Sequence, residues 1–212
     1  MCKLPDKVQP KNKIQLKQLI GYAFKHNIYD LNFIDTSNIT DMSWLFEYIN
    51  CNFDISNWDV SNVTDMEFIF YGCTNFNCDL SSWDVSSVTN MSHMFYCCKN
   101  FDCDLSRWDV SNVTDMTSMF TFCNKFDCDL SNWDVSNVTG MYFMFGYCNQ
   151  FNCDLSCWNT SKVKDMSFMF NQCKAFEGKG LEQWNVSNVE DFREIFYKCS
   201  KVIIPNWYWY KK

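Results

Sequence analysis

The chain carries at residues 83–107 the stretch WDVSSVTNMSHMFYCCKNFDCDLSR, and this unit decides the fold. Nearly the same run, 25 residues apart each time, begins at Trp58, Trp108, Trp133 and Trp158. It returns at Trp184 after one extra residue, and a shorter, divergent copy opens at Ile34. A period of about 20 to 50 residues is typical of solenoids, in which each repeat stacks on its neighbours. The sequence therefore predicts a stack of about seven coils.

The repeat divides the chain of 212 residues into three parts. We expect residues 1–33 to form an N-terminal capping segment, residues 34–202 the repeat solenoid, and residues 203–212 an aromatic C-terminal cap. Apolar residues from Ile14 to Phe24 follow a helical spacing with lysines on the other side, which predicts an amphipathic helix over residues 11–26. Such a helix would cover the open side of the first coil. A basic helix that lies on a membrane surface is the alternative.

Each coil contains a pattern for a short helix and patterns for extended segments. Met66, Ile69, Phe70 and Cys73 follow the spacing i, i+3, i+4, i+7, which predicts one stripe of a short helix. Residues 60–64 are rich in β-branched side chains and suit a short parallel strand, while residues 76–80 alternate and suit a second extended segment. Which of the two forms the main sheet stays open. The predicted fold class is an α/β solenoid in which each coil has short parallel strands and a short helix.

The recurring Trp-Asp-Val-Ser-Asn-Val-Thr-Asp-Met, followed by Met-Phe-x-x-Cys-x-x-Phe, resembles the BspA-like leucine-rich-repeat proteins. This family is named for bacterial surface proteins and is also found in large DNA viruses and protists. The resemblance covers about residues 34–202. It implies a right-handed, leucine-rich-repeat-like solenoid and, by analogy, a role in adhesion or protein binding. One departure from the family pattern is a column of cysteines at Cys78, Cys103, Cys128 and Cys153, where a polar residue is expected.

The charge distribution argues against nucleic acid as a partner. The formal net charge is −7, and no Lys or Arg lies between Lys25 and Lys99. Non-specific binding to nucleic acid requires a basic surface. No secretion signal, no lipid-anchor motif and no run of 18 apolar residues is visible, so we expect no membrane span. The compartment stays unknown, with a reducing, intracellular one favoured over the cell surface.

The 14 cysteines are interpreted mainly as structural thiols. One column continues the apolar stripe of the predicted helix at Cys73, Cys98, Cys123, Cys148, Cys173 and Cys199. Disulfides of the type Cys73–Cys78 within each coil are the alternative, although they would leave Cys173 and Cys199 without partners. A zinc site is not expected, because Cys-x-x-Cys pairs and spare histidines are missing.

Two columns of aspartates allow either a calcium-binding array or local Asx turns. They begin at Asp59 and at Asp79, and Asn159 and Asn185 continue the first column without its charge. That replacement keeps an Asx turn and weakens a cation site, so turns are favoured. His26 and His93 have no evident nucleophile or orienting partner. We therefore expect no catalytic residue, no metal and no cofactor, and the chain is predicted not to be an enzyme.

Positions that vary between coils face solvent and carry many aromatic side chains. They form the columns of Trp44, of Tyr71 and of Tyr48. Because aromatic residues are enriched at the centres of interfaces, we predict a protein-binding stripe there. Its predicted residues are Trp44, Phe68, Tyr71, His93, Tyr96, Phe122, Phe143, Tyr147 and Phe168. The alternative is that these rings pack between adjacent coils.

The sequence thus predicts a non-enzymatic repeat protein that acts as a protein-interaction or adhesion module. The first alternative is a structural component of a larger viral or envelope assembly, with end-to-end self-association. A weaker alternative is a carbohydrate-binding surface that uses the tryptophan and aspartate columns. This alternative requires exposed side chains at Trp58, Trp83, Trp108 and Trp133.

Overall fold

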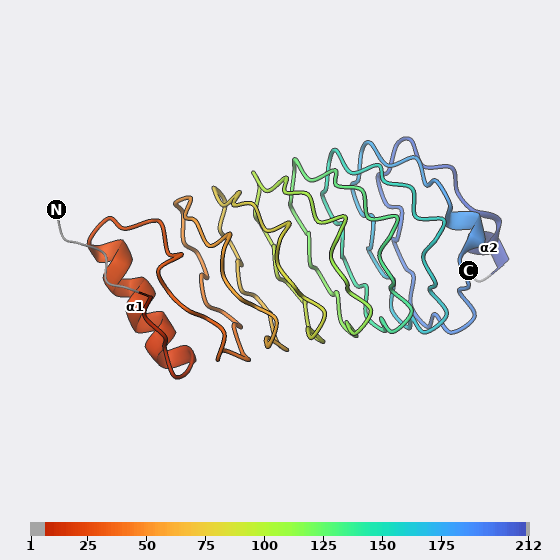
Figure 1. Ribbon diagram of the computed structural model, residues 1–212. Coiled ribbons are helices and arrows are strands. Elements are labelled where there is room, and N and C mark those ends of the chain that lie inside the picture. Colours follow the sequence, from red (N-terminus) through yellow and green to blue (C-terminus); the bar gives the residue numbers. More distant parts are fainter. Residues whose placement is uncertain (1–6, 211–212) are drawn as a thin grey trace.

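The computed structural model describes residues 7–210 as an elongated stack of coils (Figure 1). The helix α1 (Lys13–Lys25) lies over the N-terminal end, and the short helix α2 (Asn206–Tyr210) lies at the opposite end. The 3-10 helix η1 (Leu181–Gln183) falls within the last coils. Neighbouring coils are joined by single parallel bridges one repeat apart, such as Asp65 with Asn90. The 25-residue period of the sequence is therefore the length of one coil.

The N-terminal helix lies where the apolar pattern predicted one. The side chain of Asn12 caps it, because its Oδ1 accepts the amide hydrogen of Gln15 at 3.1 Å. Leu16, Ile20 and Ala23 are buried against the first coil. These contacts remove from water the apolar surface that a terminal repeat leaves open.

The short helix predicted within each coil is absent from residues 7–210, and that prediction was wrong. Phe68 and Gly72 have φ angles of 55° and 73°, and the equivalent residues of other coils also have positive φ. A right-handed helix requires negative φ throughout. The segment is instead a run of tight turns in which the amide of Ile69 donates to the carbonyl of Met66, three residues back.

The alternate amides of the same segment point to the next coil. The pairs of one junction are Met66 to Asn90, Phe68 to Ser92, Phe70 to Met94 and Gly72 to Tyr96, with N···O distances of 2.7–3.0 Å. Local turns thus use every second amide, and the neighbouring coil accepts the others. Every coil therefore presents donors toward the C-terminal end and acceptors toward the N-terminal end.

The short strands predicted at residues 60–64 and 76–80 are also not formed in the described part of the chain. The amide of Val63 donates to the carbonyl of Val60 at 2.9 Å, and the carboxylate of Asp59 accepts the amide of Ser61 at 3.1 Å. These contacts close turns and leave no room for a ladder of several residues. Coil-to-coil pairing is limited to isolated bridges, most of them at the column of Asp65.

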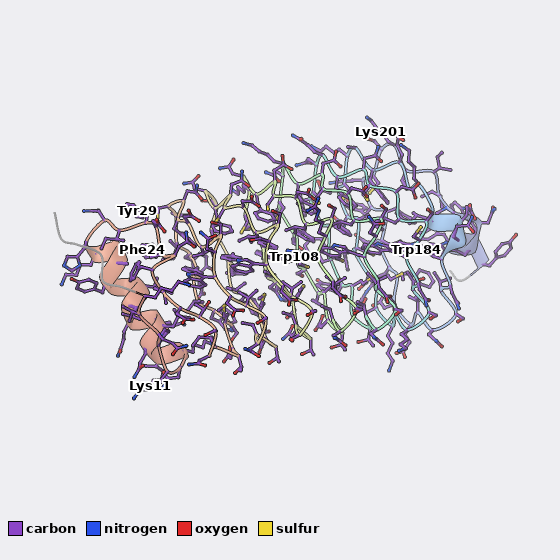
Figure 2. The ribbon with its side chains drawn as sticks, in the orientation of Figure 1. Lys11, Phe24, Tyr29, Trp108, Trp184 and Lys201 are labelled. Carbon is purple, nitrogen blue, oxygen red and sulfur yellow. The ribbon has the colours of Figure 1, made fainter. Side chains whose placement is uncertain are left out.

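The core consists of continuous columns of identical side chains. Met66, Ile69, Phe70 and Cys73 are fully buried, so the predicted stripe is correct as a core face although it is not helical. The ring of Phe95 stacks between Phe70 and Phe120 at centroid distances of 5.4 and 5.6 Å. Trp108 and Trp184 lie inside the stack (Figure 2). Stability along the chain therefore depends on each coil's contacts with its neighbours.

Candidate interaction surface

The predicted site residues gather on the turn segments of successive coils and form one surface. We call this surface the aromatic face. It consists of the predicted residues Trp44, Phe68, Tyr71, His93, Tyr96, Phe122, Phe143, Tyr147 and Phe168, together with Tyr48, which stands in one of the variable columns but was not among the predicted residues. Most of these residues have a φ angle between 53° and 64°. Because Ser118, Gln172, Glu194 and Lys198 have the same φ at the equivalent positions of other coils, this conformation belongs to the repeated turn and not to the aromatic residues as such.

The rings of the aromatic face contact one another from coil to coil. In the N-terminal half, the centroid distances are 3.8 Å for Trp44–Phe68, 4.3 Å for Phe68–His93 and 4.8 Å for Tyr71–Tyr96. In the C-terminal half, they are 5.7 Å for Tyr96–Phe122, 4.4 Å for Phe122–Tyr147 and 6.1 Å for Phe143–Phe168. The structure therefore brings every predicted site residue into a single chain of ring contacts.

The rings are packed between coils on one side and open to solvent on the other. Tyr48 is 62% exposed and Trp44 is 37% exposed, while the remaining members of the face are half-buried. Ser118 is buried where the neighbouring coils place His93 and Phe143, so the face shifts at this coil to the column of Phe122. The same side chains thus pack between coils and remain partly exposed to solvent.

Two glycines make room for the rings. A Cβ built on Gly72 would lie 2.5 Å from Cδ1 of Tyr48, and one built on Gly146 would lie 2.4 Å from Cε2 of Phe143. Gly72 also has a positive φ of 73°, which glycine adopts without steric cost. Both glycines stand at variable positions, so the sequence alone does not show their role. The positions of the neighbouring rings show it.

Tyr142 extends the aromatic face and was not among the predicted site residues. It is 39% exposed, and its ring lies 6.0 Å from Phe168 and 5.8 Å from Phe143. Its column holds Glu67, Ser92, Thr117 and Ser167 in other coils, so the variation of that column was the available signal.

The N-terminal half of the aromatic face has a negative rim. Burial, together with the charges of Asp65 and Asp115, raises the pKa of Glu67. One cation already lies at this rim, because Nζ of Lys13 approaches the carboxylate of Asp41 at 2.9 Å and Oγ of Ser43 at 2.5 Å. Apart from Lys13, the charged side chains named at this rim are therefore carboxylates.

The aromatic face also contains two perturbed titratable groups. Burial, reinforced by the neighbouring Tyr48, raises the pKa of Tyr71 to about 12. Burial lowers the pKa of His93, opposed by the charge of Asp115. Nδ1 of His93 is buried without a hydrogen-bond partner. His93 therefore acts as a neutral ring that stacks on Phe68 and lies 6.0 Å from the ring of Tyr96.

The tryptophan column does not provide a carbohydrate-binding surface, and that alternative was wrong. Its side chains are 2–4% exposed at Trp58, Trp83, Trp108 and Trp133. Each indole donates to a carbonyl of the preceding coil, as Nε1 of Trp108 does to Leu80 at 3.0 Å. These rings stabilise the core, and sugar stacking requires exposed ring faces.

The cysteines between residues 7 and 210 are free thiols, so the alternative of disulfides within each coil was wrong. Sγ of Cys98 donates to the carbonyl of Phe70 at 3.1 Å, and burial raises the pKa of its thiol. In the second column, Sγ of Cys103 accepts the amide of Leu80 at 3.1 Å and lies 3.8 Å from the carboxylate of Asp79. Cys2 lies outside the described residues.

The aspartate columns form Asx turns. The carboxylate of Asp84 accepts the amide of Ser86 at 3.1 Å, and that of Asp79 accepts the amide of Ser81 at 2.9 Å. Between residues 7 and 210, no three Asp, Glu, His or Cys side chains converge in a geometry that would hold a metal ion. Over the same range, none of the helices has the length and apolar character that a membrane crossing requires.

Comparisons with known proteins give a family but no function. The family described as "Mycoplasma protein of unknown function, DUF285" matches residues 14–127 and again residues 98–207. No curated protein and no solved structure matches the chain. The two overlapping matches cover α1 and nearly the whole stack of coils. The chain is therefore a repeat protein that belongs to the family described as Mycoplasma protein of unknown function, DUF285.

Proposed function

We propose that this chain is a non-enzymatic repeat protein that binds a protein partner through the aromatic face. The observation that carries the proposal is the unbroken series of half-exposed rings from Trp44 to Phe168. These rings stand at positions that differ between coils, whereas the core columns repeat nearly unchanged.

The geometry of the face suits binding for two physical reasons. Aromatic rings bury a large area, and rings already stacked lose little conformational freedom when a partner covers them. Tyr48 and Trp44 are the most exposed members of the face and are the expected anchors. The negative rim around Glu67 adds a preference for a partner with basic residues.

The same proposal includes the fold class and the kind of binding that the repeat motif implies. The parallel bridges between coils and the resemblance to BspA-like proteins support a right-handed, leucine-rich-repeat-like solenoid. The BspA-like family is named for bacterial surface proteins, so adhesion is the specific form of protein binding that the resemblance implies. A structural role in a larger assembly is the second candidate, because the C-terminal end of the stack, within the described residues, carries unpaired backbone donors.

A peptide-display experiment tests the proposal and works before any partner is identified. A random dodecapeptide phage library is panned on the wild-type chain, on the double variant Trp44→Ser/Tyr48→Ser, and on the control Tyr22→Ser/Tyr29→Ser. The control removes exposed rings outside the aromatic face. We expect the wild type and the control to enrich the same peptides and the face variant to lose them. Enrichment of the same peptides on all three proteins would show that the aromatic face is not the binding surface.

A further inference from the structure

The last coil ends in a row of backbone donors beside an apolar cavity, and we call this end of the stack the C-terminal edge. We propose that the C-terminal edge binds a segment of a partner protein that carries the apolar pattern of the repeat itself. The segment would take the place of a further coil. This site is separate from the aromatic face and does not depend on the function proposed for it.

The donor row follows from the hydrogen bonding of the interior coils. There, every second amide of the turn segment donates to a carbonyl of the next coil. In the last coil the equivalent amides have no acceptor among residues 7–210, and they belong to Phe192, Glu194, Phe196 and Lys198. On the opposite side the last coil is fully paired, since the carbonyls of Asp191, Arg193, Ile195 and Tyr197 accept the preceding coil's amides at 2.7–3.0 Å. The last coil therefore has the donors of a coil-to-coil junction, but no acceptors lie opposite them among residues 7–210.

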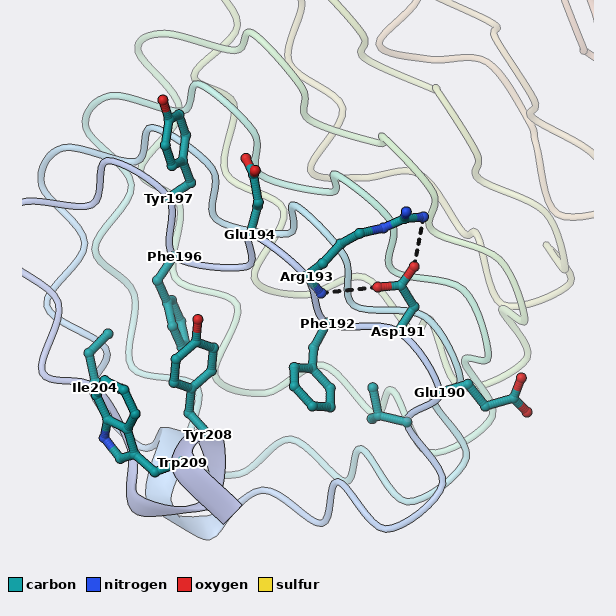
Figure 3. Close-up of a pocket in the computed structure, with 11 residues that line it drawn as sticks. Glu190, Asp191, Phe192, Arg193, Glu194, Phe196, Tyr197, Ile204, Tyr208 and Trp209 are labelled. Carbon is teal, nitrogen blue, oxygen red and sulfur yellow. Dashed lines mark hydrogen bonds and ion pairs between the residues drawn. The ribbon is translucent and has the colours of Figure 1, made fainter. Parts of the chain in front are cut away.

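A cavity lies next to these donors (Figure 3). Its volume is about 720 Å³, within the range of pockets that hold ligands. Its apolar wall consists of Phe192, Phe196, Ile204, Tyr208 and Trp209. Phe196 stacks on Phe170 at 6.0 Å, and Tyr208 of α2 lies 5.7 Å from the same ring, so the cavity lies beside the end of the phenylalanine column. A segment with apolar side chains would contact this wall.

Helix α2 closes only part of this end. Nε1 of Trp207 donates to the carbonyl of Leu181 at 2.7 Å, the contact that Trp184 makes with Leu155 one coil earlier. Trp207 thus continues the tryptophan column. Within the described residues, however, α2 provides no acceptor for the donor row, and Trp209 remains 62% exposed. Within residues 7–210, α2 therefore covers the ring of Phe196 and leaves the donor row without an acceptor.

The occupant follows from the junctions inside the chain. It must present the carbonyls of every second residue, and it must place apolar side chains at its first, fourth and fifth positions, as Met116, Met119 and Phe120 do. Main-chain hydrogen bonds would supply affinity and the apolar wall would supply specificity, as in other edge-to-segment recognition. Arg193 is paired with Asp191 at 2.9 Å, whereas Glu190 and Glu194 have no ion-pair partner in the described chain. Flanking lysines on the segment are therefore favoured.

A second copy of the chain fits this edge less well than a different protein. The N-terminal end of the stack is overlain by α1, and Lys13 is bound to Asp41 and Ser43 of the first coil. A second copy would have to displace this helix before its first coil reached the donor row. A free segment of a partner protein meets no such obstacle.

An NMR titration of the full chain tests this proposal. The probe is a synthetic peptide with the sequence of residues 112–122 and two added lysines at each end. We expect saturable shifts and at least about tenfold slower hydrogen exchange at the amides of Phe192, Glu194, Phe196 and Lys198. Phe168 and Phe170, whose amides are already paired, should not respond. No saturable change at the four amides with millimolar peptide, or the same change with a scrambled peptide, overturns the proposal.

Two variants separate the cavity from general effects on folding. Trp209→Ala removes an exposed ring of the wall and should weaken peptide binding about threefold or more. Tyr210→Ala removes an exposed ring of α2 that is not part of the wall, so it should leave binding within about twofold. Equal binding by Trp209→Ala contradicts the placement of the peptide in the cavity. Shifts of the four amides with protein concentration alone would identify a second copy as the occupant and overturn the choice of a partner protein.

Discussion

The imidazole of His93 lies flat against the ring of Phe68, with 4.3 Å between the centroids and 7° between the planes. The ring of Phe68 also stacks on Trp44, at a centroid distance of 3.8 Å. The three rings come from three successive coils, and Nδ1 of His93 is buried without a hydrogen-bond partner. A histidine placed in this way behaves as an aromatic spacer, and a proton on it would be costly.

The first prediction concerns pH. Burial lowers the pKa of His93 below its ordinary value of 6.5, so the unfolded chain binds this proton more tightly than the folded one. The stabilisation from neutral His93 is complete above pH 6.5 and is lost as pH falls from there toward the pKa in the fold. The loss has a limiting slope of about 1.4 kcal/mol per pH unit. His93→Phe, which copies Phe68 and Phe143, should remove this slope.

Thermal unfolding between about pH 7.5 and pH 5 measures the effect of His93. The aspartates provide an internal reference, because backbone N–H groups lower the pKa of Asp54 and Asp79. Their contribution is present above the ordinary value of 3.8 and is lost only below it, in both proteins. Parallel Tm curves for wild type and His93→Phe over this pH range would contradict the assignment.

A second prediction compares the core with the aromatic face. Phe120 is fully buried between Phe95 and Phe145, so Phe120→Ala should lower the free energy of unfolding by about 3–5 kcal/mol. Phe122 is half-buried, and Phe122→Ser should cost only about 1–2 kcal/mol. Urea unfolding of both variants measures the difference. Equal losses would mean that the aromatic face serves packing alone.

A third prediction concerns Gly72. Alanine at this position would place Cβ 2.5 Å from the ring of Tyr48 and would hold a side chain at a φ of 73°. We expect Gly72→Ala to destabilise the fold by about 1–2 kcal/mol from the backbone angle, before any cost of moving the ring. Gly21→Ala is the matched control, because nothing lies within 4 Å of its Cβ. It should stabilise α1 by up to about 1 kcal/mol. Changes of equal sign in the unfolding free energy of the two variants would refute this role of Gly72.

A fourth prediction concerns the thiols. Cys157 is exposed, whereas Cys98 and Cys123 are fully buried and their pKa values are raised well above the ordinary 9.0 by burial. Only the thiolate reacts, so alkylation of the native chain should label Cys157 rapidly and spare the buried column. Peptide mapping by mass spectrometry after brief iodoacetamide treatment shows the pattern. Labelling of Cys98 at the rate of Cys157 without denaturant would contradict the buried column.

The sequence was sufficient for the core and insufficient for the backbone. The period located the buried columns, since Met66, Ile69 and Phe70 are fully buried as predicted. The prediction of a short helix in each coil was wrong because two successive tight turns place side chains on one face with the same spacing as a helix. A phenylalanine at position 68 does not indicate a positive φ, whereas the glycine at position 72 of the same segment does.

The variable columns of the sequence contain the rings of the aromatic face, but they also contain Ser118 and Thr121, which are buried. The ring contacts within the aromatic face were not predictable, since they depend on turn geometry that places Phe68 between Trp44 and His93. The C-terminal edge could not be predicted from the sequence. Whether the amide of Phe196 has an acceptor is decided by where α2 lies, and residue types do not determine this.

The affinity of a peptide selected on the wild type, measured by calorimetry, tests the proposed function most directly. The comparison is between the wild-type chain, Trp44→Ser/Tyr48→Ser, and the control Tyr22→Ser/Tyr29→Ser. The account predicts that the face variant binds at least about tenfold more weakly, a loss of about 1.4 kcal/mol, while the control retains the wild-type Kd. Equal affinity for all three proteins would contradict binding through the aromatic face.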